Sequence, residues 1–311
     1  MLTMYTFILI GYVLRKVLIL PEGSDTTMSR LEAYIFVPAL SLSNCLKNCT
    51  VETFMENYHI IFYGAIILLC AIILAHPLSR LFVRKADTSE LLYQRNIYKY
   101  AMTFGNYGFM GNFIMLSVFG SEAFFKYQMF TLLASIVCNG WGIYILIPKE
   151  MNSSIWTNFK NGLLKPPIIA IFVGIILGLL NVRQYMPNFL MKVFSDAGSC
   201  QGPVAMVLAG FVIGGYKMKD MLLNKKVYFA SVLRLIVIPA IMMLVLHGLG
   251  TSKDIMTLAL ICFATPLGLN TIVYPAAYGG DTKTGASMAT ISHTLSILTI
   301  PLMYLLFIVW L

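Results

Sequence analysis

The chain has 311 residues, of which 59% are hydrophobic and 11% are charged, with a net charge of +9. A soluble domain carries about a quarter charged residues, so this composition excludes a soluble enzyme, a nucleic-acid-binding protein and a disordered chain. The apolar stretches are long and continuous, whereas the strands of outer-membrane barrels are short and alternating. We therefore expect an all-α membrane protein.

Ten apolar stretches qualify as candidate transmembrane helices, which need about 20 residues each. In chain order they are Met1–Leu20, Met28–Leu46, His59–Phe82, Ile97–Phe119, Phe124–Ile147, Pro166–Leu180, Asn188–Tyr216, Val227–Leu249, Ile255–Tyr278 and Gly285–Leu311. The longest connection, residues 148–165, carries Trp156 and Phe159 among lysines, a pattern typical of a segment on the membrane surface.

The positive charges predict an orientation. Most of the 22 Lys and Arg residues lie in the connections that follow the odd-numbered spans. Because cytoplasmic loops carry an excess of Lys and Arg, these connections are expected in the cytoplasm. The sequence therefore predicts a multi-pass plasma-membrane protein with both termini outside the cytoplasm.

The two halves of the chain resemble each other. Five Gly, Pro and Asn residues recur in order at an offset of about 160 to 165 residues: Gly11 and Gly174, Pro38 and Pro203, Pro77 and Pro239, Asn106 and Asn270, and Gly120 and Gly280. Since each half holds five spans, the second half must enter the membrane upside down, as in many secondary transporters. We expect repeats over residues 1–147 and 166–311, joined by a cytoplasmic linker over 148–165.

The fourth and ninth spans are rich in helix-breaking residues. They read FGNYGFMGNF and ATPLGLNTIVYPAAYGG, and glycine weakens a helix while proline removes a backbone donor. We predict breaks near mid-membrane at Gly105, Gly108, Pro266 and Pro275. Small residues also serve close packing in membrane helices. An Asn at each break nevertheless favours a substrate site, because half-helix N-termini attract anions.

Three stretches resemble the auxin efflux carrier family: VPALSLS at 37–43, FGNYGFMG at 104–111, and residues 265–302 with a Tyr-Gly-Gly-Asp turn. The resemblance covers essentially the whole chain. That family includes plant PIN transporters and bacterial permeases for malate, malonate and related acids. The chain lacks the long central cytoplasmic loop of plant PINs, so we expect it to be closer to the bacterial permeases.

The resemblance implies that the fourth and ninth helices cross at their breaks. It also implies a scaffold of spans 1, 2, 6 and 7, a transport domain of spans 3–5 and 8–10, a homodimer through spans 2 and 7, and elevator-type alternating access. Carried over by motif, the substrate-facing residues are Asn106, Tyr107, Thr265, Asn270, Thr271, Asn139 and Ser43.

Three ionisable residues fall inside the expected spans, where such residues are functional candidates by default. Asp196, with Gln201 nearby, is a proton carrier or cation ligand, or else an acid at the membrane boundary beside Lys192. Arg234 binds an anion through its planar guanidinium, or it snorkels toward the cytoplasm, or it caps the carbonyls of a broken helix. His293 relays protons, or it is a packed, hydrogen-bonded helix residue.

These observations predict a secondary active transporter that exports or exchanges small organic carboxylates, coupled to protons, to sodium or to neither. A sodium-coupled symporter of the bile-acid type is the nearest alternative, and a non-transporting sensor or a channel is another. An enzyme is disfavoured because the acids are scattered and no G-x-S-x-G motif occurs. The six cysteines form no C-x-x-C pair, so we expect neither metal nor cofactor, and the partners are an organic acid and the lipid bilayer, with no nucleic acid.

Overall fold

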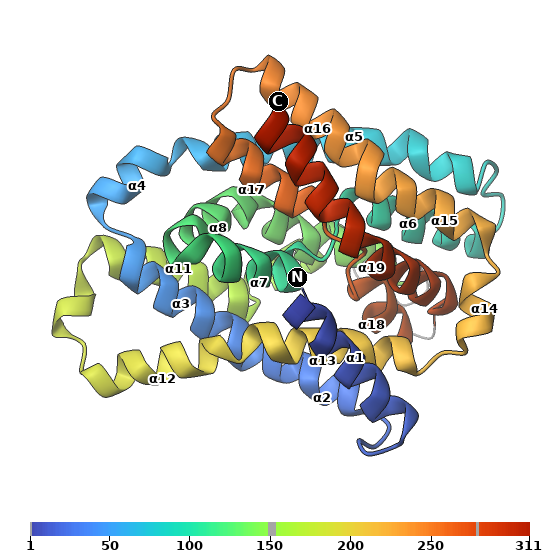
Figure 1. Ribbon diagram of the computed structural model, residues 1–311, viewed down its shortest axis with the longest axis horizontal. Coiled ribbons are helices and arrows are strands. Elements are labelled where there is room, and N and C mark those ends of the chain that lie inside the picture. Colours follow the sequence, from blue (N-terminus) through green and yellow to red (C-terminus); the bar gives the residue numbers. More distant parts are fainter. Residues whose placement is uncertain (1, 149–153, 278–279) are drawn as a thin grey trace. The chain divides into compact units, whose positions relative to one another are not determined.

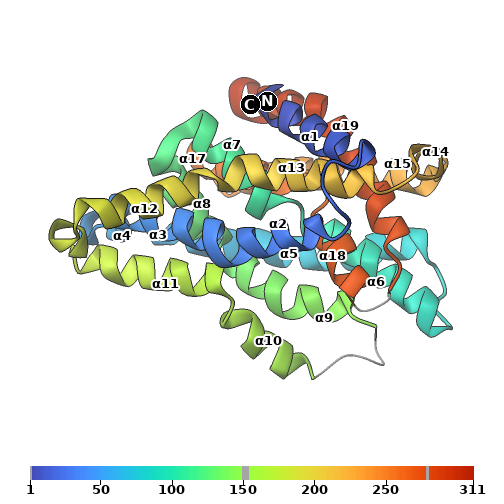
Figure 2. The same cartoon turned by 90° about the horizontal axis from the view of Figure 1, so that it is seen from below.

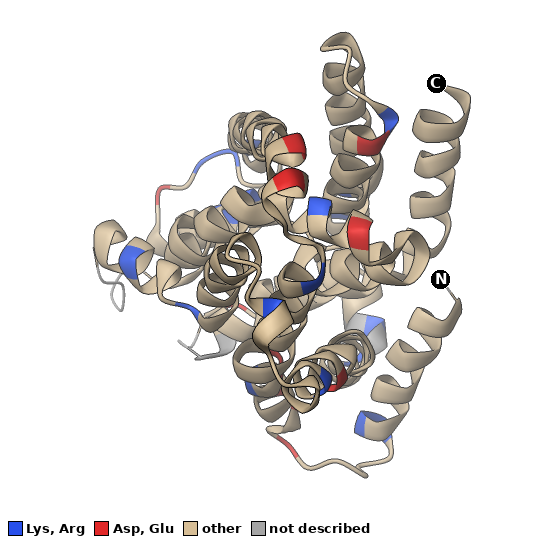
Figure 3. Ribbon diagram, turned by 90° about the vertical axis from the view of Figure 1, so that its left-hand side faces the viewer, with Lys and Arg blue, Asp and Glu red and all other residues tan. Residues whose placement is uncertain are grey.

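The computed structural model describes residues 2–148, 154–277 and 280–311. This described part of the chain is helical and contains no named strand, which confirms the expected all-α class. Lys, Arg, Asp and Glu occupy only a small part of the ribbon (Figure 3). The expected linker over 148–165 is described in part, because residues 149–153 lie outside the described residues, as do Tyr278 and Gly279 of the Tyr-Gly-Gly-Asp turn.

The elements follow one another along the chain as labelled in Figure 1. The α-helices are α1 (Leu2–Lys16), α2 (Ser24–Leu31), α3 (Val37–Asn48), α4 (Val51–Asn57), α5 (His59–Phe82), α6 (Ser89–Thr103), α7 (Asn112–Ile114), α8 (Gly120–Val137), α9 (Ile143–Leu146), α10 (Ile155–Leu163), α11 (Pro166–Leu179), α12 (Asn188–Ser199), α13 (Gln201–Gly214), α14 (Met218–Leu222), α15 (Lys225–Val232), α16 (Ile238–Gly248), α17 (Lys253–Ala264), α18 (Asn270–Ala277) and α19 (Lys283–Tyr304). The π-helical turns are η1 (Glu32–Phe36), η2 (Tyr107–Gly111), η3 (Met115–Phe119), η4 (Cys138–Gly142), η7 (Leu233–Val237) and η8 (Leu305–Trp310), and η6 (Val182–Tyr185) is a 3₁₀ turn.

Some of the expected spans form helical runs long enough to cross a membrane, and others do not. Within the described residues, 5 helical runs are long and apolar enough to cross a membrane, and a sixth is added if α10 and α11, bent by 50°, count as one span. The five are Val51–Phe82, Tyr107–Leu146, Asn188–Gly214, Lys225–Gly248 and Lys283–Trp310. The expected fourth span, Ile97–Phe119, is broken, and its second half continues into the fifth through Gly120, whose φ of 86° favours glycine. The full count of ten spans therefore stays a prediction.

The chain divides into two compact units. Unit 1 comprises Met1–Phe62, Gly108–Ile136 and Asn161–Gly215, and unit 2 comprises Tyr63–Tyr107, Val137–Lys160 and Tyr216–Leu311. The spans expected to form the scaffold fall in unit 1 but share it with residues 108–136, from the spans expected to move. The roles of scaffold and transport domain stay predictions.

Four π-helical turns carry polar residues of interest. Glu32 begins η1, Tyr107 begins η2, and Asn139 and Arg234 lie in η4 and η7. The turns η1 and η7 are each followed by a proline, which cannot donate a backbone hydrogen bond, so the local ladder is disturbed at both places. Such turns recur at functional sites in other proteins. Glu32 is fully buried, and both of its carboxyl oxygens lack a hydrogen-bond partner among the described residues.

Unit 1 is held together by close helix crossings at glycines. Helix α1 lies along α13, and α3 lies along α11, in both Figure 1 and Figure 2. A Cβ added at Gly11 would lie 2.0 Å from the Val207 carbonyl oxygen, and one at Gly210 would lie 1.8 Å from that of Ile8. A Cβ at Gly174 would lie 2.8 Å from Cys45 Cβ. Only glycine lets these backbones approach so closely.

Replacing one of these glycines should weaken unit 1. Gly210→Ala forces α1 and α13 apart, and overpacking of this kind costs about 1–3 kcal/mol. We expect a lower melting temperature of the detergent-solubilised protein. Gly248→Ala in α16 is the matched control, because nothing lies within 4 Å of its added Cβ, and alanine is the better helix former. Equal melting temperatures for the two variants would contradict the proposed role of the α1–α13 contact.

Candidate functional site at the crossing of two helix breaks

Both helix breaks expected from the sequence are present. Helix α6 begins after Thr88, whose hydroxyl accepts a hydrogen bond from the backbone N–H of Leu91, and it ends at an extended Phe104. Helix α17 begins after Ser252, which caps it in the same way, and it ends at an extended Thr265. The chain becomes helical again in η2 and in α18. Two short extended segments, 104–106 and 265–269, therefore interrupt otherwise helical stretches of unit 2.

The two extended segments are joined to each other. Gly105 and Leu267 form an isolated antiparallel bridge, and the backbone N–H of Asn106 donates to the Pro266 carbonyl oxygen at 2.7 Å. A Cβ added at Gly105 would lie 2.2 Å from Arg234 Nη2 and 2.7 Å from Thr265 Oγ1, so the crossing leaves room only for glycine there. The breaks thus satisfy each other's backbone groups, as a non-helical segment in an apolar environment requires.

Arg234 closes the end of α6. Its side chain is fully buried, and Nη1 donates to the carbonyl oxygens of Met102 at 3.3 Å and Thr103 at 3.5 Å. The guanidinium carbon also lies 5.6 Å from the centre of the Phe263 ring, a cation–π arrangement. This geometry favours the capping interpretation of Arg234, because the last carbonyls of a helix have no partner within it. Its expected contact with an anion stays a prediction.

Asn106 is hydrogen-bonded to His293 of α19. Both side chains are buried, and Asn106 Nδ2 lies 3.4 Å from His293 Nε2. His293 Nδ1 lies 2.7 Å from the Ala289 carbonyl oxygen, which can only accept, so Nδ1 carries the hydrogen. In the neutral ring, Nε2 is then an acceptor that faces the Asn106 amide. The imidazole is therefore oriented by its own helix and linked directly to the first break.

Asn270 takes part in a second polar cluster. Its Nδ2 donates to the Tyr100 hydroxyl at 2.8 Å, and that hydroxyl lies 3.1 Å from Cys138 Sγ. Asn139 follows Cys138 in η4 and is half-buried. Each break asparagine is thus fixed by a different helix: Asn106 by α19, and Asn270 by α6.

Hydroxyl groups form hydrogen bonds with backbone groups at the second break. Thr265 and Thr271 are fully buried and donate to the carbonyl oxygens of Cys262 and Gly268, at 3.1 and 3.0 Å. The Ser292 hydroxyl of α19 accepts from the backbone N–H of Leu267 at 3.1 Å. The threonines therefore use their hydroxyl hydrogens within their own segment.

The expected site residues fall into two groups. Unit 2 holds Gly105, Asn106, Tyr107, Asn139, Arg234, Thr265, Pro266, Asn270, Thr271, Pro275 and His293. Unit 1 holds Ser43, Gly108, Asp196 and Gln201. Most residues expected at the crossing therefore belong to one compact unit.

Several residues differ from their expected settings. Gly108 lies inside η2 and Pro275 inside α18, so neither forms a break. Asp196 is exposed and pairs with Lys192 at 2.9 Å, and its role stays a prediction. Ser43 donates to the Leu40 carbonyl oxygen of its own helix at 3.2 Å, and Gln201 is buried with Nε2 unbonded among the described residues.

Tyr100, Cys138 and Ser292 are site residues that the sequence did not single out. The side chain of each contacts a break residue that is distant from it in the chain. Asn270 and Tyr100, for example, are 170 positions apart. A single sequence carries no signal for such pairs. Ser292 had a weak one, since it precedes His293 in a run rich in hydroxyl residues.

Removing the Arg234 guanidinium should destabilise the crossing. Arg234→Met keeps side-chain bulk but leaves the carbonyls of Met102 and Thr103 without this donor, at a cost of about 1–3 kcal/mol. We expect a lower melting temperature even without substrate. Arg84→Met, at an exposed position, is the control and should melt like the wild type. A melting temperature unchanged in Arg234→Met, with substrate binding lost, would instead identify Arg234 as a substrate contact.

Comparison with known proteins identifies the family of the chain. A family model described as membrane transport protein matches residues 1–160 and 150–304, which is nearly the whole chain. No curated protein matches the chain significantly. The matched family is that of the auxin efflux carriers, whose members are transporters and not enzymes. The apolar helices and the two joined breaks fit such a membrane transporter. The chain therefore belongs to the auxin efflux carrier family of membrane transport proteins.

Proposed function

We propose that the protein is a secondary active transporter of small organic carboxylate anions, working by efflux or exchange, with its substrate held where the two helix breaks cross. One observation carries this proposal: each helix break holds an asparagine. Asn106 follows Gly105, which pairs with Leu267, and Asn270 begins α18. Asn106 is buried and Asn270 is half-buried, and polar side chains inside membrane helices often mark a substrate pathway. Their presence at both breaks supports a ligand-binding role.

The donors at the crossing suit a carboxylate. An amide nitrogen carries two hydrogens, so the bond from Asn106 to His293 leaves a second N–H for a ligand. Helical segments begin at Tyr107 and at Asn270, and helix N-termini carry partial positive charge. The substrate would therefore be bound by uncharged donors and backbone dipoles, with Arg234 stabilising the nearby end of α6.

The alternating-access part of the proposal rests on the inverted repeat. A Cβ added at Gly11 would meet the backbone of Val207, and one added at Gly174 would lie 3.5 Å from Leu42 Cα. Gly11 and Gly174 are matched by the repeat offset, and so are Leu42 and Val207. Reciprocal contacts between matched positions support two halves related by pseudo-symmetry. In transporters of this kind, one group of helices moves against another around the substrate, and we propose an elevator-type movement on a homodimeric scaffold.

For ion coupling we propose a proton carried by His293. His293 is the coupling candidate whose ring is hydrogen-bonded to a break asparagine. Protonation would turn Nε2 from an acceptor into a donor, so the Asn106 amide would have to rotate to present its oxygen. The proton and the substrate would then compete for, or share, the same amide. Asp196 has no such link, since it pairs with Lys192 on the surface of unit 1.

Removing either break amide should abolish substrate binding. Asn106→Ala and Asn270→Ala each delete the donors proposed for the carboxylate, so we expect no uptake in proteoliposomes and no substrate-induced thermal shift. The unliganded variants should remain folded and elute from a sizing column like the wild type. Asn188→Ala, at an exposed position, is the control and should transport normally. Normal uptake by both break variants would refute the crossing as the substrate site.

The coupling residue can be identified by the pH dependence of transport. His293→Gln keeps hydrogen-bonding capacity towards Asn106 but does not titrate, so uptake should persist while losing its pH dependence. Asp196→Asn should leave the pH profile unchanged. The opposite pattern would assign coupling to Asp196 and leave His293 as a packing residue. The readout is initial uptake in liposomes across a series of imposed proton gradients.

A further inference from the structure

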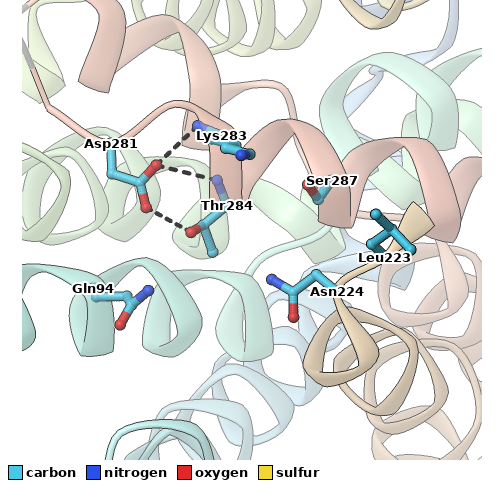
Figure 4. Close-up of a pocket in the computed structure, with 7 residues that line it drawn as sticks. All are labelled: Gln94, Leu223, Asn224, Asp281, Lys283, Thr284 and Ser287. Carbon is cyan, nitrogen blue, oxygen red and sulfur yellow. Dashed lines mark hydrogen bonds between the residues drawn. The ribbon is translucent and has the colours of Figure 1, made fainter. Parts of the chain in front are cut away.

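Unit 2 contains a polar cavity of about 500 Å³, a size typical of small-molecule sites. Leu223 is the one apolar residue that lines it, and the other lining residues are polar or charged: Gln94, Asn224, Asp281, Lys283, Thr284 and Ser287. Figure 4 shows these side chains coming from three places in the chain, around the start of α19. The charge distribution of the sequence places this end of the unit in the cytoplasm.

Asp281 neutralises the start of α19. One of its carboxyl oxygens accepts from the backbone N–H groups of Lys283 at 2.9 Å and Thr284 at 3.2 Å, and the other accepts from the Thr284 hydroxyl (Figure 4). The helix N-terminus, where a phosphate would otherwise bind, is therefore already occupied by a carboxylate of the chain. A further anion in the cavity must be held by side-chain donors.

The cavity wall supplies such donors. Ser287 is 2% exposed, and no hydrogen bond from its hydroxyl is recorded among the described residues. The amide of Gln94 and the Lys283 ammonium are likewise without a recorded bond there. Asn224 accepts from the Lys226 backbone N–H through Oδ1, which leaves its NH₂ group for a ligand.

We propose that this cavity is a second binding site for a small polar carboxylate, separate from the crossing of the helix breaks. One ammonium, two amides and one hydroxyl match the several oxygens of a di- or tricarboxylate. The site does not depend on the proposed function, because it is built from different residues.

The test uses the full-length protein in nanodiscs, with citrate and succinate as probes and calorimetry as the readout. The crossing is first disabled by Asn106→Ala together with Asn270→Ala. In this background we expect one saturable site. Gln94→Glu should then weaken binding at least about tenfold, because a like charge faces the anion. Ser287→Ala should weaken it by a smaller factor. Lys160→Gln is the control, since it removes one exposed Lys outside the cavity.

Four outcomes would overturn the proposal. They are the absence of binding in the crossing-disabled protein, binding unaffected by Gln94→Glu, an equal loss in Lys160→Gln, and binding of inorganic phosphate but neither carboxylate. If the disabled protein does not fold, the wild-type stoichiometry is measured instead, and Gln94→Glu should bind one anion fewer than the wild type. Failure of the crossing in uptake assays leaves this result intact, so the two proposals fail independently.

Discussion

The constraint on which unit 2 depends is that every backbone polar group removed from a helix must find another partner. Two helices stop and restart here, and each interruption frees N–H and C=O groups that water cannot reach in an apolar environment. The bridge between Gly105 and Leu267, with the bond from Asn106 to Pro266, resolves both interruptions at once. Neither break would be stable alone, because each supplies the partners of the other.

The side chains around the crossing follow from the same constraint. Arg234 is buried because the last carbonyls of α6 need a donor, and Ser292 is placed where the Leu267 N–H needs an acceptor. The asparagines differ from these residues: the Asn106 backbone N–H serves the crossing, while the amides of Asn106 and Asn270 extend to His293 and Tyr100. Groups needed for the fold and groups left for a ligand therefore lie within a few residues of each other, and mutations here need a stability measurement beside every transport assay.

Unit 1 depends on a different interaction, which is backbone approach at glycine. The contacts of Gly11, Gly174 and Gly210 bring helices close enough for their backbones to touch. In a bilayer, van der Waals packing replaces the hydrophobic effect as the force between helices. Unit 1 therefore relies on close backbone packing, whereas the crossing in unit 2 is held by hydrogen bonds.

The sequence by itself determined the class of protein, the positions of the breaks and the asparagine at each of them. These properties are local: apolar length, glycine and proline act on the residues beside them. The sequence could not decide whether Arg234 binds an anion or caps a helix, because its partners at Met102 and Thr103 lie more than 130 positions away. It placed Gly108 and Pro275 at breaks that begin elsewhere, and it passed over Tyr100, Cys138 and Ser292. Only the tertiary structure shows where the breaks begin and which groups Arg234 and the two asparagines contact, since the partner that satisfies a buried polar group is set by which distant segments meet.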